Sequence, residues 1–126
     1  MLSEVGRGAA FGDVDNDGAT DVLINNNNGA PRLLMNQVGA KNHWVGLKLD
    51  ALAARVQVIL DDGRSIWRRA RSDGSYASAN DPRVLVGLGA STRPPRVRVV
   101  WPDGKTEEWA SVDIDKYSVL KKGRGR

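Results

Sequence analysis

Polar and apolar residues alternate along most of this chain, with a period of about two residues. A period of two places every second side chain on the same face, which is typical of half-buried β-strands. The pattern predicts strands over residues 9–12, 22–24, 32–36, 43–49, 54–60, 65–71, 84–88, 96–101, 106–109 and 117–120. No long segment has the apolar spacing of a helix. We therefore predict an all-β fold.

Glycine-containing dipeptides separate these strands where tight turns are needed. Asp or Asn before Gly tolerates the positive φ angles of hairpin turns. Such pairs stand at residues 28–29, 62–63, 73–74 and 103–104. With the apolar runs beside them, two of these turns predict clear β-hairpins over residues 55–67 and 97–109.

The strands divide the chain into two regions of different character. Before Lys41-Asn42 the strands are short and loops dominate, whereas after it the strands lengthen and the hairpins become regular. We predict a first unit over residues 1–40, a β domain over residues 43–122 and a basic tail over residues 123–126. A long loop over residues 72–83 either packs on a sheet or serves a partner.

The loop between the first two predicted strands carries four aspartates: Asp13-Val14-Asp15-Asn16-Asp17-Gly18-Ala19-Thr20-Asp21. Alternate carboxylates in a tight loop can point inward, and Ca²⁺ takes about six to eight oxygen ligands at flexible angles. Gly18 supplies the sharp turn around the ion. The predicted ligands are the side chains of Asp13, Asp15 and Asp17, the carbonyl of Ala19, and Asp21, which closes the loop.

A solvated turn and an EF-hand are the alternatives to a calcium loop between two strands. Asp- and Gly-rich segments form solvated turns, because their side chains bond to their own backbone. Clustered like charges repel one another, however, and a cation removes that cost. An EF-hand is excluded, because its twelfth loop position needs Glu and holds Ile24 here, and a β-rich run follows the loop.

The composition limits the other kinds of chemistry. The 126 residues are 40% hydrophobic and include one His and no Cys, which excludes disulfides, thiolate metal sites and multi-histidine sites. No apolar run is long enough to predict a transmembrane helix. Residues 1–7 lack the apolar region of a signal peptide. The expected organisation is one domain, or one domain with a fragment attached.

Charge is distributed unevenly between the two halves. Residues 1–63 carry 5 Lys/Arg and 8 Asp/Glu, a net −3, whereas residues 64–126 carry 14 and 7, a net +7. A basic half suggests binding of nucleic acid or another polyanion, with Trp67 among its neighbouring arginines as a stacking platform. The four Trp residues alternate with polar neighbours, however, so we expect them to face a core.

Residues that could catalyse a reaction are few. His43 is the only imidazole, and it lies beside Trp44 at the start of a predicted strand with no nucleophile near it in sequence. No Ser lies in a Gly-x-Ser-x-Gly motif. The acidic pair at residues 61–62 lies in a predicted hairpin turn. We expect no enzymatic activity.

The N-terminal residues resemble a known repeat. Gly8-Ala9-Ala10-Phe11-Gly12 leads into the aspartate loop, and Asp21-Val22-Leu23 follows it. This order is similar to an FG-GAP or VCBS-type repeat, the calcium-binding blade unit of integrin-like β-propellers. One repeat is present, whereas a propeller has at least about four blades. The resemblance implies a partial blade from the C-terminal part of a larger propeller protein.

Five later segments fit a second family pattern: residues 42–49, 54–56, 72–76, 86–89 and 99–104. They resemble the ASPIC/UnbV domain that follows FG-GAP repeats in proteins of the cartilage-acidic-protein type. The resemblance implies an antiparallel β-sandwich or barrel-like domain, outside the cell or at its envelope, that binds a protein or glycan partner. We therefore expect a non-enzymatic, calcium-binding interaction or adhesion module.

The single blade has strand edges and an apolar face without neighbours. Such a segment must dock on the β domain, pair with another copy or fray. Self-association through the exposed edges is one expectation that follows.

Overall fold

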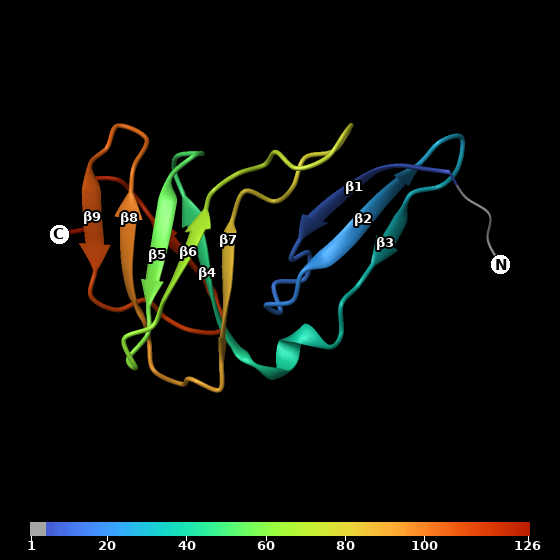
Figure 1. The fold of residues 1–126 in the computed structure, drawn as a ribbon. Helices are drawn as coiled ribbons and strands as arrows, with labels where there is room; N and C mark the ends of the chain where they lie inside the picture. Colours follow the sequence, from blue (N-terminus) through green and yellow to red (C-terminus); the bar gives the residue numbers. More distant parts are fainter. Residues whose placement is uncertain (1–4) are drawn as a thin grey trace.

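The computed structural model describes residues 5–126 and places them in three β-sheets (Figure 1). The all-β prediction is confirmed, and within the described residues no helix is long and apolar enough to cross a membrane. The strands are β1 (Gly6–Gly12), β2 (Asp21–Asn26), β3 (Arg32–Leu34), β4 (His43–Leu49), β5 (Arg55–Ile59), β6 (Ser65–Arg69), β7 (Val84–Gly89), β8 (Arg96–Val100), β9 (Thr106–Trp109) and β10 (Tyr117–Leu120). Every predicted strand is present.

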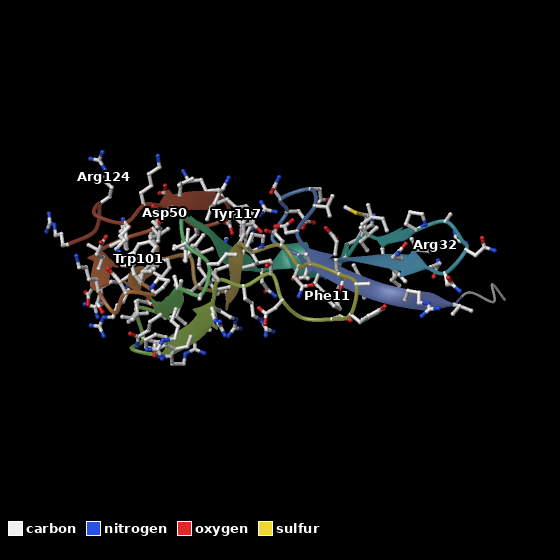
Figure 2. All side chains as sticks on the ribbon, turned by 90° about the horizontal axis from the view of Figure 1, so that it is seen from above. Phe11, Arg32, Asp50, Trp101, Tyr117 and Arg124 are labelled. Atoms are coloured by element: carbon white, nitrogen blue, oxygen red, sulfur yellow. The ribbon has the colours of Figure 1, made fainter. Side chains whose placement is uncertain are left out.

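The first three strands form a separate antiparallel sheet in the order β1-β2-β3. The aspartate loop joins β1 to β2, and Gly12 pairs with Asp21 where the loop closes. A 3₁₀ turn, η1 (Gly39–Lys41), then leads to β4. Figures 1 and 2 show this sheet at one end of an elongated molecule, with the other strands gathered at the opposite end.

Strands β4 to β10 form a two-sheet sandwich around the hydrophobic core. One sheet has the order β10-β4-β7 and the other β6-β5-β8-β9. Alternate side chains of both sheets point inward, as the period of two predicted. The buried cluster comprises Val45, Leu47, Ala54, Val56, Val58, Leu60, Ala70, Val84, Val86, Leu88, Val97, Val99, Trp101, Val112 and Leu120. Removal of this surface from water is the main force that stabilises the sandwich.

The sandwich departs from the expected fold in two ways. No barrel closes, because strands β4 to β10 stay in two separate sheets whose edge strands, β10 and β7 in one and β6 and β9 in the other, do not pair across. In addition, β10 pairs with β4 in parallel rather than antiparallel, with Tyr117 opposite Gly46. The reason is the connection: the chain leaves β9 in one sheet and crosses to the other before β10, so no hairpin fixes the strand direction.

Two of the predicted hairpins are confirmed by their pairing and turn geometry. β5 pairs with β6, and β8 with β9, both antiparallel. Gly63 (φ 84°) and Gly104 (φ 85°) adopt the left-handed conformation that these turns require. The pair at residues 73–74 does not form a hairpin turn. It lies in the long connection between β6 and β7, which run in different sheets.

The four Trp residues do not share one environment. Trp101 is in the core with Trp109 packed against it, their ring centroids 6.5 Å apart. Trp44 is buried on the opposite face of β4, against Tyr117. The expectation that all four face a core is wrong for Trp67, which is 46% exposed. Trp67 lies on the outer face of β6, an edge strand, and its cross-strand partner is Gln57 of β5.

Candidate metal centre at the junction of the two regions

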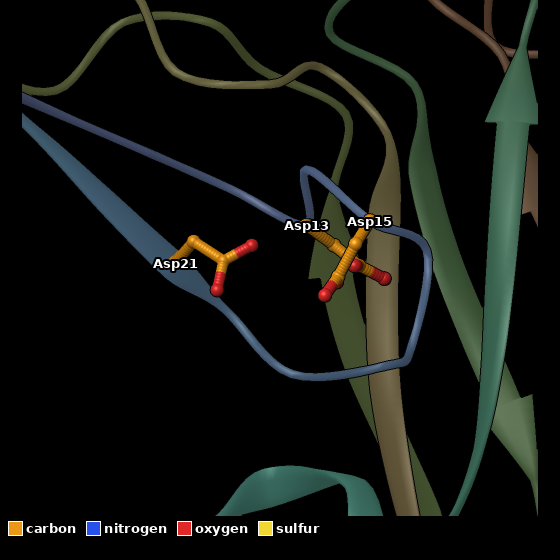
Figure 3. A group of neighbouring side chains, drawn as sticks. All are labelled: Asp13, Asp15 and Asp21. Atoms are coloured by element: carbon orange, nitrogen blue, oxygen red, sulfur yellow. The ribbon is translucent and has the colours of Figure 1, made fainter. Parts of the chain in front are cut away.

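The aspartate loop brings three carboxylates together between β1 and β2. One oxygen from each of Asp13, Asp15 and Asp21 lies within 4.8 Å of the others. Asp13 directly follows β1 and Asp21 begins β2, so the antiparallel pairing of these strands sets the distance across the mouth of the loop. Figure 3 shows the backbone curling from Asp13 round to Asp21, with the Asp13 and Asp15 side chains extending inside the curve.

Two of these carboxylates are buried and held by backbone donors. Asp13 is 2% exposed and accepts hydrogen bonds from the amides of Asp17 (3.1 Å) and Gly18 (3.0 Å). Asp21 is 1% exposed and accepts from the amides of Val14 and Asn36, each at 2.8 Å. These contacts fix the carboxylates in place before any ligand binds.

The remaining predicted ligands differ from these two. Asp15 is exposed and makes no hydrogen bond with another residue of the described chain, so both its oxygens are open to a ligand. Asp17 does not belong to the group of three, and one of its oxygens accepts from the Ala19 amide at 2.8 Å. Ala19 is buried. The parts assigned to Asp17 and to the Ala19 carbonyl therefore stay predictions.

Gly18 is required for two reasons at once. Its φ of 87° lies in the left-handed region, as the predicted turn demands. A Cβ at this position would also lie 2.2 Å from the indole nitrogen of Trp44, so only glycine lets the loop lie flat against that ring. The loop is thus packed on the outer face of β4, the face opposite the sandwich core.

Tyr117 and Arg83, both from the sandwich, bind the loop directly. The Tyr117 hydroxyl donates a hydrogen bond of 2.9 Å to Asp13 Oδ2, the oxygen that also accepts from the Gly18 amide. The Arg83 guanidinium donates to the Asp13 carbonyl and to the Asn16 side chain, each at 2.6 Å, and lies 4.0 Å from the centre of the Tyr117 ring. In Figure 2, Tyr117 lies between the two ends of the molecule.

The protonation states of this junction follow from its contacts. Burial raises the pKa of the Tyr117 hydroxyl above its usual value, and the hydrogen bond to Asp13 adds to the rise. Burial alone would raise the pKa of Asp81, but hydrogen bonds from the Arg83 side chain and amide hold that pKa below its usual range. At neutral pH the junction therefore holds a neutral tyrosine and a charged Arg83–Asp81 pair.

The long loop between β6 and β7 clamps the first sheet from the other side. The Asn80 side chain accepts from the Phe11 amide at 3.0 Å, and the Asp81 amide donates to the Phe11 carbonyl at 2.9 Å. Gly8 lies so close to this loop that a Cβ would be 2.8 Å from the Tyr76 carbonyl. The first unit was expected to dock on the β domain, to pair with another copy or to fray. In the structure it docks on the β domain of the same chain.

A pair that sequence reasoning missed lies at the start of β4. His43 Nδ1 is 2.7 Å from one oxygen of Asp115, whose other oxygen accepts from the Trp44 amide at 3.1 Å. The hydrogen bond to His43 holds the pKa of Asp115 below its usual value. The two residues are 72 positions apart, so no local signal in the sequence pointed to the contact.

The donor set fits a hard cation. Three carboxylates offer oxygen ligands only, which suits Ca²⁺ and does not suit metals that prefer nitrogen or sulfur. Within residues 5–126 none of the three forms an ion pair with Lys, Arg or His. The two buried carboxylates therefore have hydrogen bonds but no ion-pair partner, and the nearby Arg83 guanidinium is already paired with Asp81.

Comparison with known proteins adds one match. A family model described as ASPIC and UnbV matches residues 45–126, which is the sandwich from the third residue of β4 onward, together with the segment that follows β10. No curated protein matches the chain.

Proposed function

The chain belongs to the ASPIC and UnbV family, whose model covers residues 45–126, and from this membership and the acidic loop we propose that it is a calcium-binding interaction module. The observation that carries the proposal is the cluster of Asp13, Asp15 and Asp21 oxygens within 4.8 Å, set on the family's β-domain. The role is binding or adhesion, without catalysis.

Ca²⁺ would be held by Asp13, Asp15 and Asp21, with Asp17 and the Ala19 carbonyl as further candidates. When bound, the ion supplies a positive charge in direct contact with these carboxylates, none of which has an ion-pair partner in the described chain. Its part in this proposal is structural. The loop connects a sheet that buries little apolar surface to Tyr117 and Arg83 of the sandwich, so a filled loop would strengthen the docking of the first sheet.

The module would belong to a larger protein. The first sheet has the strand–acidic loop–strand order that resembles an FG-GAP or VCBS blade, and it leaves apolar side chains of both faces exposed, among them Leu23, Leu33 and Leu34. Further blades packed on these faces would cover them. An extracellular or envelope setting, where calcium reaches millimolar concentrations, would suit a site of low affinity.

The absence of catalysis is also a proposal, and the His43–Asp115 pair is its strongest challenge. A carboxylate that orients an imidazole occurs in many hydrolases. Here the surrounding hollow is lined by Asn16, Asp17, Lys41, Asn42 and Trp44, which include no Ser, Thr or Cys nucleophile. The pair instead ties the start of β4 to the segment before β10, a structural role that explains both of its hydrogen bonds.

Calcium titration followed by amide NMR signals tests the proposal. We expect the signals of residues 13–21 to shift with a dissociation constant on the order of 10⁻⁴ to 10⁻³ M, the range of extracellular calcium modules. Asp15→Ala is the informative variant, because Asp15 holds no other group in place, and it should lose the response. Asp73→Ala is the matched control, an exposed aspartate in the β6–β7 loop, and it should respond like the wild type.

Two results would count against the site. Either unchanged loop signals at about 10 mM Ca²⁺, or equal binding by the wild type and Asp15→Ala, would show that the loop is an ordinary polar turn.

A further inference from the structure

The gap between the two sheets of the sandwich opens into a cleft beside the first sheet. The cleft has a volume of about 210 Å³, and the residues lining it include Arg68, Arg69, Arg71 and Val84, with Phe11 on the side of the first sheet. β6 and β7, one edge strand of each sheet, contact each other beside this gap. We call it the arginine cleft.

The positive charge of this cleft is not balanced within the chain. Arg83 and Asp81 also line it, but they pair with each other at 2.6 Å. The Asp13 carboxylate is engaged by backbone amides and by Tyr117. The other three arginines line the cleft as well; none of them has an acidic partner in the described chain, and the only hydrogen bond among them runs from Arg68 to its neighbour's carbonyl.

Like charges also face one another on the neighbouring strand. Arg55 of β5 is the cross-strand partner of Arg69, and directly opposed like charges destabilise a sheet. The Arg55 guanidinium lies 5.8 Å from the centre of the exposed Trp67 ring. Alternation along β6 places Trp67 and Arg69 on the same face of the strand. The Trp67 ring and the Arg69 guanidinium therefore lie in a row, with Arg69 at the end nearer the cleft.

We propose that the arginine cleft and the adjoining Trp67 bind an acidic oligosaccharide, a sugar chain that carries carboxylate or sulfate groups. Guanidinium forks match planar carboxylates and sulfate oxygens, and they would hold the acid group in the cleft. An exposed Trp offers an apolar face to a sugar ring at low entropic cost. The ligand would supply the negative charge that Arg68, Arg69 and Arg71 lack.

The same surface fits nucleic acid less well. A nucleic-acid strand carries a phosphate on every nucleotide and needs a basic groove that follows its backbone, but Asp13 of the acidic loop and Asp81 line the same cleft as the three arginines. A continuous row of phosphates would pass close to those carboxylates and be repelled. A short sugar chain can place an acid group on the arginines and hydroxyl groups beside these carboxylates, which accept hydrogen bonds from them. This inference rests on the proposed binding role of the chain and names its partner class, but it does not depend on the metal.

Titration calorimetry with three probes tests the inference: a heparin-derived tetrasaccharide, trigalacturonate and a thymidine decanucleotide. The first two distinguish sulfate from carboxylate, and the third represents nucleic acid. We expect one or both sugars to bind the wild type. The double variant Arg69→Gln/Arg71→Gln should weaken that binding about tenfold or more, because two charge-assisted contacts are lost.

The matched control is Arg64→Gln/Arg93→Gln, which also removes two positive charges. Both arginines are exposed and pair with Asp62 and Asp61 at a distance from the cleft. We expect this variant to change sugar affinity by no more than about twofold. Circular dichroism would establish that each variant keeps the wild-type fold.

Three outcomes would overturn the inference: no sugar binding, equal loss of binding in both double variants, or binding of the oligonucleotide at least as tightly as the sugars. Parallel titrations with Ca²⁺ and with EGTA separate this inference from the proposed metal site. Calcium binding without sugar binding would refute the sugar site alone. Sugar binding without a calcium response would refute the metal site alone.

Discussion

The first sheet and the sandwich are held together by opposite means. The described residues include three buried polar side chains, Asp13, Asp21 and Asn26, and all three belong to the first region. That region has one buried apolar side chain, Ala19, whereas the sandwich contains every other buried hydrophobic residue. The sandwich is therefore stabilised by an apolar core, and the first sheet by hydrogen bonds and docking contacts.

The two regions should therefore respond differently to ions and to the loss of single hydrogen bonds. An apolar core depends little on ions or on single hydrogen bonds. Buried carboxylates respond to both, because the free-energy cost of burying them depends on the charges and hydrogen-bond donors around them. The contrast predicts that core substitutions, loop substitutions and metal removal will act on different parts of the molecule.

The largest expected effect comes from a pair of leucine truncations. Leu47 is fully buried in the sandwich, whereas Leu33 of β3 is 47% exposed. Leu47→Ala should lower the free energy of unfolding by about 2–5 kcal/mol, through lost burial and a residual cavity. Leu33→Ala should change it by no more than about 0.5 kcal/mol. Urea denaturation followed by Trp fluorescence measures both. Equal losses would mean that the two regions share one core.

A smaller loss of stability is expected from substitution of Gly18 in the aspartate loop than from the core truncation, and Gly63 in an ordinary hairpin turn provides the comparison. Gly18 and Gly63 both have positive φ, but a Cβ meets Trp44 at Gly18 and nothing within 4 Å at Gly63. Each change to Ala costs the backbone strain, and Gly18→Ala should cost about 1–3 kcal/mol more because it pushes the loop from the ring. Native-state hydrogen exchange of the adjoining strands gives both values. Similar costs would show that the loop does not lie against Trp44.

The smallest effect concerns the hydroxyl that joins the regions. Tyr117→Phe removes the hydrogen bond to Asp13 and should cost about 1 kcal/mol at neutral pH. Exposed Tyr76, changed to Phe, is the control and should cost nothing measurable. Hydrogen exchange of β1 and β2 amides, which report on docking, would compare them. An equal effect of both variants would remove Tyr117 from the docking contacts.

Tyr117 also determines the direction in which the stability of the protein changes with pH. Its folded pKa is raised, so the folded state keeps the proton at pH values where the unfolded tyrosine has ionised. The stabilisation is complete below the unfolded pKa of about 10 and is lost as the pH rises toward the folded value. Stability of the wild type should therefore fall above about pH 10 more steeply than that of Tyr117→Phe.

The fold was largely predictable from the sequence, because strand alternation and turn glycines are local signals. Residues such as Val56 and Val58 alternate with polar neighbours, and each hairpin is closed by its own Gly. The exposure of Trp67 was not predictable in this way. Alternation shows that a residue shares a face with others, but whether that face meets a core depends on which sheet covers it.

The candidate site was predictable only in part. The spacing of Asp13, Asp15 and Asp21 placed the cluster, because all three lie within one short loop. The contributions of Tyr117 and Arg83 come from residues about 70 to 100 positions away, and the His43–Asp115 pair is equally remote. Contacts of this range follow from the packing of two sheets, which a local pattern does not encode.

Hydrogen exchange of the whole chain, in Ca²⁺ and in EGTA, tests most directly whether calcium holds the first sheet on the sandwich. We predict that EGTA will remove protection from the amides of β1, β2 and the aspartate loop, while β4, β5 and β8 keep theirs. An even loss of protection over all strands, or protection of β1 and β2 that is the same in both buffers, would contradict the account.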